Sequence, residues 1–388
     1  MRLVTFLGTS EYKEANYSFD NKTYRSRYVA HALTEFLDIT EVIVLATEEA
    51  WKKNGKDLEQ ILLAAKRLTV QSKPISAGIR PQESWQLFDA IVDAIQDSDF
   101  DVLLDITHGF RMQPFFAAAC VAFVQSVSPK VPSIRVVYGE YRSEGDSPIH
   151  ELTSFVDLLA WTRSLMLFLR TGQVDGLWQR IRNMDHDLHR KWASNNSQGE
   201  RPKIGRLRKA LEDFGEQIIT VRTGSLLMGD KATAKYLFDT LVETQEEIAR
   251  EMPPLAKVID QIQDMVKPLL LEGARFNTKK GQQGLHALAT LYCGLGRFSE
   301  AYAVAREGQI SRQAPDEADT PNTQEFLDEK RKEFDKKWGE EANEIFEFRN
   351  DLLHAGFRQR PLPANTIIKK LGDILKSWKQ KIDEMPES

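Results

Sequence analysis

Roughly the first 150 residues alternate short apolar runs with amphipathic stretches, a pattern typical of an α/β domain. Runs such as Glu41–Ala46 (EVIVLA) are apolar at consecutive positions, as expected for strands that are covered on both faces. The predicted strands are Leu3–Leu7, Glu41–Ala46, Lys73–Ile79, Phe100–Ile106 and Ile134–Gly139, and the predicted helices are Tyr24–Leu37, Asp57–Leu68, Pro81–Gln96 and Pro114–Val127. This alternation predicts a Rossmann-like parallel sheet covered by helices, with strand order 3-2-1-4-5.

The pattern changes after Pro148. A short strand-like segment, Ile149–Leu152, is expected at an edge of the sheet, and from Phe155 onward almost every stretch follows a helical period. The predicted helices are Val156–Arg170, Val174–Trp192, Ile204–Gly224, Lys231–Glu251, Leu255–Glu272, Gly284–Leu295, Ser299–Glu307, Thr323–Ala355 and Asn365–Met385. The sequence therefore predicts an α/β domain over residues 1–154 and an all-α domain over residues 155–388.

Composition narrows the class of protein without identifying it. A chain of 388 residues suggests two or three domains, and its formal net charge of -5 does not indicate a globally basic nucleic-acid binder. The two cysteines, Cys120 and Cys293, lie in apolar helical contexts and are expected to be buried thiols. Neither a targeting signal nor an apolar run of membrane-spanning length occurs, so we expect a cytoplasmic protein that does not contact a membrane.

Two loops after predicted strands carry residues suited to a phosphorylated ligand. Strands one and four of the predicted order are neighbours, and the crevice between their carboxyl ends is where such sheets bind ligands. Backbone N–H groups and hydroxyls suit phosphate oxygens, an arginine offers a bidentate contact, and His and Tyr rings can stack on a base. The candidate binding residues are Gly8, Thr9, Ser10 and Tyr12 in the first loop, and Thr107, His108, Gly109 and Arg111 in the second.

Each loop also has a simpler interpretation. Gly-Thr-Ser after a strand is common turn chemistry, and Asp105 can equally cap the next turn or touch a ligand. Neither the G-x-G-x-x-G fingerprint nor the Walker A motif is present, which argues against a dinucleotide cofactor site. The joint occurrence of both loops at the predicted switch point favours a nucleotide pocket.

A second candidate site lies near the C-terminus. Arg349 and His354 could form a ribonuclease site without a metal: histidine would deprotonate a ribose 2′-OH, and arginine would stabilise the phosphate charge. Asn350 could orient either group. Five residues along an ideal helix rotate two side chains by about 140° relative to each other, so the pair converges only at a frayed helix end or across a dimer axis. Gly356 makes a helix end at this point plausible.

Simpler interpretations stand beside this one as well. His354 could merely cap the helix C-terminus, where a positive imidazole is favoured by the helix dipole. Looser Arg–His spacings also occur at Arg25 and His31, at Arg180 and His186, and at Arg182 and His189. The stretch Asp185–Lys191 raises the question of a metal site, but a solvated helix face is the better interpretation. We expect no metal site.

Taken together, these motifs resemble a known family. The start FLGTS followed by Tyr12-Lys13-Glu14 and the loop Asp105–Arg111 resemble CARF domains (CRISPR-associated Rossmann fold). Arg349-Asn350 with His354 resembles the signature of HEPN ribonucleases. The domain order is similar to that of the CARF–HEPN effector ribonucleases of type III CRISPR systems. The resemblance is weak over residues 174–343, where the sequence shows only a helical period.

The resemblance implies a specific activity. Members of the family bind cyclic oligoadenylate on the two-fold axis of a CARF dimer, which activates a composite HEPN site built by both protomers. They cut single-stranded RNA without a metal and leave a 2′,3′-cyclic phosphate, and no cofactor is implied. Thr9, Ser10, His108, Gly109 and Arg111 become ligand contacts by this resemblance, and Arg349 and His354 become catalytic. Family habit favours the ring of four adenosines as the activator and a homodimer or larger even-numbered oligomer.

Two other functions remain open at the level of sequence. The helical domain could be non-catalytic, which would leave a nucleotide sensor that acts on a regulator. Alternatively, the CARF pocket itself could degrade the cyclic oligoadenylate, since some relatives do so. Nothing in the sequence decides the ring size, the base preference of RNA cleavage or the role of residues 174–343.

Overall fold

The structure is a computed structural model that describes residues 1–65, 68–76, 80–96, 100–109, 113–127, 133–194, 197–251, 253–273, 275–312, 332, 339–357 and 359–387. The chain divides into two compact units, Met1–Thr162 and Arg163–Ser388. The division falls inside α6 (Thr153–Thr171), the first helix that follows the sheet.

An eight-stranded mixed sheet forms the first unit, in the order β3-β2-β8-β7-β6-β1-β4-β5. The strands are β1 (Arg2–Leu7), β2 (Ala15–Phe19), β3 (Lys22–Ser26), β4 (Glu41–Ala46), β5 (Thr69–Pro74), β6 (Val102–Asp105), β7 (Ile134–Gly139) and β8 (Asp146–Glu151). The five strands β5, β4, β1, β6 and β7 are mutually parallel, in the predicted order 3-2-1-4-5. The prediction of a Rossmann-like parallel sheet is thus confirmed for this part of the sheet only.

The other three strands correct the prediction. β8 pairs antiparallel with β7 and parallel with β2, so it is an internal strand and not the expected edge. β2 and β3 form a hairpin where part of a helix was predicted over Tyr24–Leu37. Its two-residue turn, Asp20-Asn21, has positive φ at both positions, which is the backbone of a type I′ turn and suits short polar residues.

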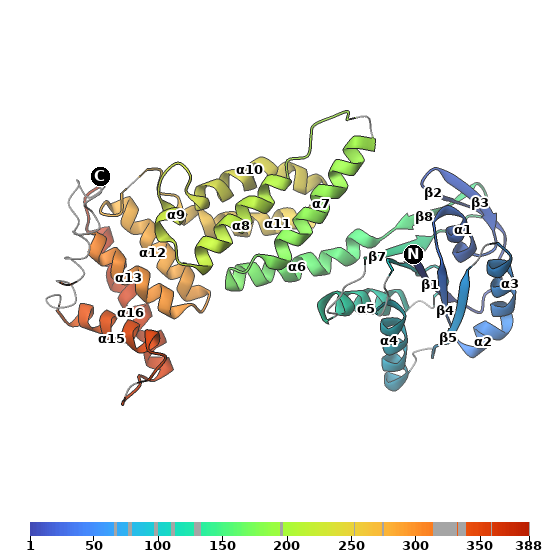
Figure 1. Ribbon diagram of the computed structural model, residues 1–388, viewed down its shortest axis with the longest axis horizontal. Helices are drawn as coiled ribbons and strands as arrows, with labels where there is room; N and C mark the ends of the chain where they lie inside the picture. The colour runs from blue at the N-terminus through green and yellow to red at the C-terminus, as the bar shows by residue number, and fades with distance from the viewer. Residues whose placement is uncertain are drawn as a thin grey trace. The chain divides into compact units, whose positions relative to one another are not determined.

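Helices cover both faces of the parallel part, as Figure 1 shows. α1 (Val29–Phe36) and α3 (Lys56–Ala65) pack through Leu33 and Leu62 into one buried cluster, and α4 (Pro81–Gln96) and α5 (Gln113–Val127) pack through Ile91 and Val121 into the other. Strand residues alternate between the two clusters, since Leu3 faces the first and Val4 the second. Burial on both faces explains why these strands read as continuous apolar runs.

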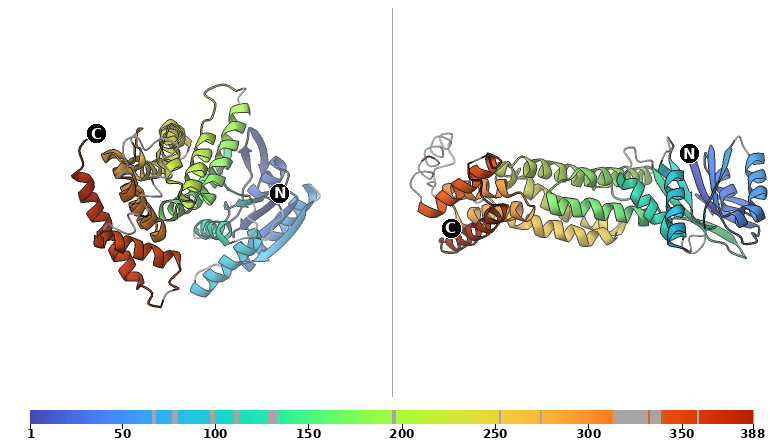
Figure 2. Two further views of the ribbon diagram at one scale, coloured as in Figure 1. Left: turned by 60° about the vertical axis from the view of Figure 1, so that its left-hand side comes forward. Right: turned by 90° about the horizontal axis from the view of Figure 1, so that it is seen from below.

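The second unit is helical throughout its described residues (Figure 2). After α6 it contains α7 (Asp175–Ser194), α8 (Gly205–Ile219), α9 (Thr223–Leu227), α10 (Thr233–Glu251), α11 (Pro253–Val266), η2 (Lys267–Leu269), α12 (Lys279–Gly294), α13 (Phe298–Ser311), α15 (Gly339–Leu353) and α16 (Ala364–Asp383). α8 packs between α7 and α10, whereas α13 packs on α12, α15 and α16. The all-α prediction is confirmed at this level.

Several predicted boundaries were wrong for identifiable reasons. The helix predicted over Ile204–Gly224 stops at Ile219, because Val221 adopts a left-handed φ of 57°. α12 begins earlier than expected, since the Thr278 hydroxyl caps it by accepting from the Gly281 N–H at 3.1 Å. Most of the predicted segment Thr323–Ala355 before residue 339 lies outside the described residues. No described helix is both long and apolar enough to cross a membrane.

Candidate functional site

The carboxyl ends of β1 and β6 lie side by side, as predicted, and a buried carboxylate joins them. Asp105 is 0% exposed, and its Oδ2 accepts from the Thr5 hydroxyl at 2.8 Å. Its Oδ1 accepts from both the N–H and the hydroxyl of Thr107. Asp105 therefore caps the turn after β6, which decides between the two roles that the sequence left open for it.

The two predicted loops meet above this carboxylate. The Gly8 N–H donates to the Tyr12 hydroxyl at 2.8 Å, and the rings of Tyr12 and His108 lie 4.4 Å apart between centroids. A β-carbon added at Gly8 would come within 2.9 Å of the His108 carbonyl oxygen, so the close approach of the loops requires glycine. The structure thus brings Gly8, Tyr12 and His108 into one cluster.

The remaining predicted binding residues divide into three groups. Thr9 is half-buried and Ser10 is exposed, so both are accessible to a ligand. The Thr107 hydroxyl is already committed, because it donates to Asp105 and accepts from the Gly139 N–H at 2.8 Å. Gly109 is half-buried, with the Gln113 side chain against its Cα, and Arg111 lies outside the described residues.

Burial sets the protonation of the aromatic cluster. It raises the pKa of Tyr12 to about 12, so its hydroxyl stays protonated at neutral pH. It lowers the pKa of His108 below the ordinary range, against the opposing effect of the Asp105 charge, so the imidazole is neutral. The Nε2 atom of His108 is buried and has no hydrogen-bond partner in the described part of the chain.

Sequence reasoning missed residues that come from β4 and β7. Lys53 and Asn54 follow β4 and hydrogen-bond to the first loop, with Asn54 only 6% exposed. Arg142, in the turn after β7, and His150, in β8, both contact the carboxylate of Glu140, at 2.8 and 2.9 Å. Hydrogen bonds from these two side chains lower the pKa of Glu140 to about 2. The available signal was topological, because these turns follow strands whose carboxyl ends reach the same edge of the sheet.

The C-terminal candidates lie where α15 ends. Its last turn closes with the Gly356 N–H donating to the Asp351 carbonyl and the Ala355 N–H to the Leu352 carbonyl, each at 3.0 Å. This is a Schellman motif, in which Ala355 takes the left-handed position with a φ of 51° and Gly356 follows it. The helix end predicted from Gly356 is present, but it falls one residue earlier than glycine preference suggests.

Arg349, Asn350 and His354 are all accessible at this helix end. His354 is exposed, and the other two are half-buried. Arg349 donates to the Asn350 side-chain oxygen at 3.3 Å, so Asn350 orients the guanidinium. Within the described residues no hydrogen bond joins Arg349 to His354, and the two side chains do not form a pair inside one chain.

The opposite face of α15 anchors it in the helical unit. Phe348 is buried and stacks on Tyr302 of α13, with ring centroids 5.9 Å apart and planes 17° apart. The Tyr302 hydroxyl donates to the Ile367 carbonyl of α16 at 2.8 Å. The face that carries Arg349 instead exposes Phe346 and Leu353, at helical spacing from it.

In the alternative His–Asp stretch, both histidines contact residues of their own helix. His189 lies 3.2 Å from the Asp185 carboxylate, and Arg190 donates to the His186 ring at 3.1 Å. Among the described residues, no group of three or more His, Cys, Asp or Glu side chains is arranged to hold a metal ion.

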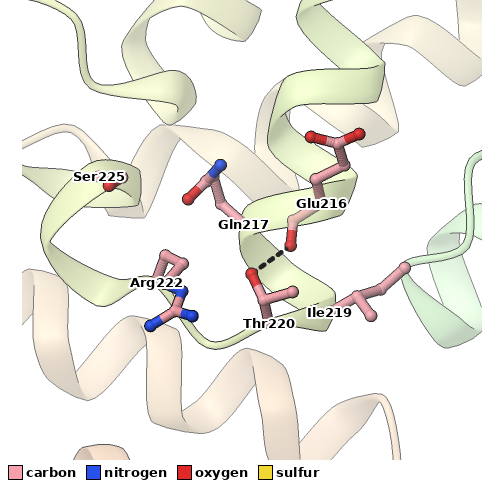
Figure 3. Close-up of a pocket in the computed structure, with 6 residues that line it drawn as sticks. All are labelled: Glu216, Gln217, Ile219, Thr220, Arg222 and Ser225. Atoms are coloured by element: carbon pink, nitrogen blue, oxygen red, sulfur yellow. Dashed lines mark hydrogen bonds between the residues drawn. The ribbon is translucent and has the colours of Figure 1, made fainter.

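A separate shallow pocket lies at the end of α8 (Figure 3). It is lined by Glu216, Gln217, Ile219, Thr220, Arg222 and Ser225. The Thr220 hydroxyl donates back to the Glu216 carbonyl at 2.6 Å, which completes the end of the helix. None of the predicted site residues lines this pocket.

Comparisons with known proteins agree with the architecture of the first unit. Residues 2–140 match the family model of the CARF domain of CRISPR system endoribonuclease Csx1. The chain is also similar to CRISPR-associated protein MJ1674 of Methanocaldococcus jannaschii, at 24% identity over 282 residues, which covers 58% of this chain. That match covers 42% of the relative, so the chain spans less than half of its length. Together the two matches support a CRISPR-associated protein with an N-terminal CARF domain.

Proposed function

We propose that this chain is an endoribonuclease of type III CRISPR defence, activated by cyclic oligoadenylate. The observation that carries the proposal is the joint placement of two sites in one chain. The domain matched to the Csx1 CARF domain holds the cluster of Gly8, Tyr12 and His108 at its switch point, and the helical unit presents Arg349 and His354 at an accessible helix end. We further propose that this helical unit is a HEPN domain.

The sensing half of the proposal rests on the cluster at Gly8, Tyr12 and His108. A neutral imidazole and a protonated phenol beside accessible backbone amides suit an adenine base and a phosphate diester, which are the two parts of a cyclic oligoadenylate. Thr9, Ser10 and Arg111 would add phosphate contacts, and Gly109 would allow close approach of the ring. The activator would be the ring of four adenosines, whose two-fold symmetry fits a dimer axis.

In the catalytic half, His354 would take the proton of a ribose 2′-OH, and the 2′-oxygen would form a bond to the adjacent phosphorus. The bond from phosphorus to the 5′-oxygen would break, the leaving oxygen would take up a proton, and a 2′,3′-cyclic phosphate would remain. Arg349, oriented by Asn350, would stabilise the charge that develops on the phosphate. The step as proposed uses no metal.

Two copies of the chain would complete the site. Arg349 and His354 are not joined within one chain, and Arg349 shares its helix face with Phe346 and Leu353, which is 56% exposed. Phe357, in the turn that follows His354, is 91% exposed. Exposed apolar side chains around a catalytic pair support a homodimer whose two-fold axis passes this helix end.

The test is a titration of cyclic tri-, tetra- and hexa-adenylate against a fluorescent single-stranded RNA reporter. We expect cleavage only with a ring present, and none from His354→Ala, which still binds the ring. His186→Ala and His189→Ala are matched controls that keep full activity. Unchanged cleavage by His354→Ala would contradict the catalytic assignment. Degradation of labelled ring with intact RNA would identify a ring nuclease, and binding without either reaction would identify a sensor.

A further inference from the structure

A π-turn interrupts the helix that follows β4, next to the first loop of the candidate sensor site. α2 (Glu48–Ala50), η1 (Trp51–Gly55) and α3 form one helical run, and η1 is its π-helical part. The Trp51 ring lies against Gly55, where an added β-carbon would be 2.4 Å from the ring, so glycine allows this turn to close. π-turns inside helices are frequent at functional sites, because the extra residue redirects neighbouring side chains.

Two side chains of η1 donate hydrogen bonds to three consecutive carbonyl groups of the first loop. The Asn54 amide donates to the Gly8 carbonyl at 2.9 Å and to the Ser10 carbonyl at 3.0 Å. The Lys53 ammonium donates to the Thr9 carbonyl at 2.7 Å. Asn54 is almost completely buried, whereas Lys53 is exposed.

Holding these carbonyls fixes the direction of the loop's amides. In a trans peptide unit the C=O and the N–H point in opposite directions. Because the carbonyls of residues 8, 9 and 10 point toward η1, the N–H groups of Thr9, Ser10 and Glu11 point away from it. In the described part of the chain these three N–H groups have no hydrogen-bond partner. Consecutive free amides that point the same way form a concavity that binds anions.

We propose that Asn54 is the positioning residue of the phosphate-binding loop and that Lys53, on the carbonyl side of this loop, adds a positive charge that attracts the ligand's phosphate. This inference rests on the proposed function, since the phosphate is a diester of the cyclic oligoadenylate. Asn54 acts through the loop backbone and does not touch the ring. Lys53 lies on the side of the loop opposite to the free amides, so its positive charge attracts the phosphate across the loop without touching it.

The experiment measures binding of fluorescent cyclic tetra-adenylate to the full chain and four variants, with thermal unfolding of each. Asn54→Ala removes both hydrogen bonds to the loop, and Lys53→Ala removes the charge. Lys53→Arg tests whether a cation alone suffices. Lys52→Ala is the matched control: Lys52 is the neighbouring lysine of the same π-turn, but it pairs with Glu48 and does not touch the loop.

We expect Asn54→Ala to weaken ring binding about tenfold or more, because the amides must be ordered at the moment of binding. Lys53→Ala should weaken ring binding about three- to tenfold, which is the effect expected when one exposed positive charge near the phosphate is removed. For Lys53→Ala, the slope of log affinity against log salt concentration should fall in magnitude by about 0.7. Loss of a purely structural residue would leave this slope unchanged. Lys53→Arg should restore that slope, and Lys52→Ala should bind like the unchanged protein.

Two results would overturn the inference. If the unchanged protein binds the ring and both Asn54→Ala and Lys53→Ala bind it equally well, the π-turn has no role in recognition, although the proposed function stands. If the unchanged protein does not bind the ring, the proposed function fails and the inference fails with it. Should Asn54→Ala not fold, the salt slope of the exposed Lys53→Ala variant decides the matter.

Discussion

Two regions of the molecule are built in opposite ways: the edge of the sheet that carries Gly8, Tyr12 and His108, here called the sensor edge because it holds the proposed ligand site, and the end of α15. At the sheet edge, the carbonyl groups of the first loop and the side chains of Asp105 and Thr107 have partners inside the same unit. At the end of α15, the one hydrogen bond of Arg349 among the described residues is to its neighbour Asn350, and His354 is exposed near the exposed Leu353 and Phe357. The difference teaches that one chain prearranges the proposed binding site by itself, whereas the proposed catalytic site would need groups from a second copy.

The largest expected effect concerns the catalytic pair. Arg349→Ala should reduce ring-activated RNA cleavage by about a thousandfold, because the phosphate charge that develops in the reaction loses its stabilising partner. Arg349→Lys should recover little, since an ammonium cannot make the bidentate contact. Rates measured at saturating ring give the effect, and Arg182→Ala is the exposed arginine control. Cleavage within about threefold of the unchanged protein would refute the assignment.

Next in size is the effect of the exposed apolar face. Leu353→Glu should reduce cleavage by about a hundredfold, since a charge at the centre of a dimer contact costs several kcal/mol on association. Ring binding should persist, because the sensor edge lies in the other unit. Dimerisation measured by sedimentation, together with cleavage, checks this. A dimeric and fully active Leu353→Glu protein would show that this face is not the dimer contact.

A smaller effect is expected at the buried carboxylate of the sensor edge. Asp105→Asn cannot accept from Thr5 and from both groups of Thr107 at once, so at least one buried donor loses its partner. The free energy of unfolding should fall by about 1–3 kcal/mol. Ring affinity should fall by about tenfold as the two loops separate. Chemical denaturation and ring titration measure both quantities, and a variant that loses neither would show that Asp105 does not join the loops.

The smallest effect is a pH dependence at His108. Burial lowers its pKa in the folded chain, so between that pKa and the ordinary value near 6.5 the unfolded state binds more protons. The free energy of unfolding should therefore decrease as the pH falls below 6.5. We expect His108→Gln to reduce the difference in melting temperature between pH 7.5 and 5.5 by about 2 °C. An equal difference in both proteins would exclude His108 as the source.

The local sequence pattern predicted best the strands that are buried on both faces of the sheet. The runs over Glu41–Ala46 and Ile134–Gly139 match their strands residue for residue, because strands covered on both faces are apolar at most positions. β5 begins at Thr69, whereas the predicted strand began at Lys73. This edge strand is mostly exposed and therefore has no apolar run to mark its position. The β2–β3 hairpin was missed although its Asp-Asn turn was a usable signal.

By itself, the sequence predicted the parallel strand order, the two chemically distinct loops and the end of the helix that carries Arg349 and His354. Only the tertiary structure decided that Asp105 caps a turn, that Thr107 is committed to Gly139 and that Asn54 holds Gly8 across 46 residues of chain. Periodicity records which side of an element is buried, and that property is local. A hydrogen bond between distant loops depends on how strands are paired, and therefore no local pattern contains it.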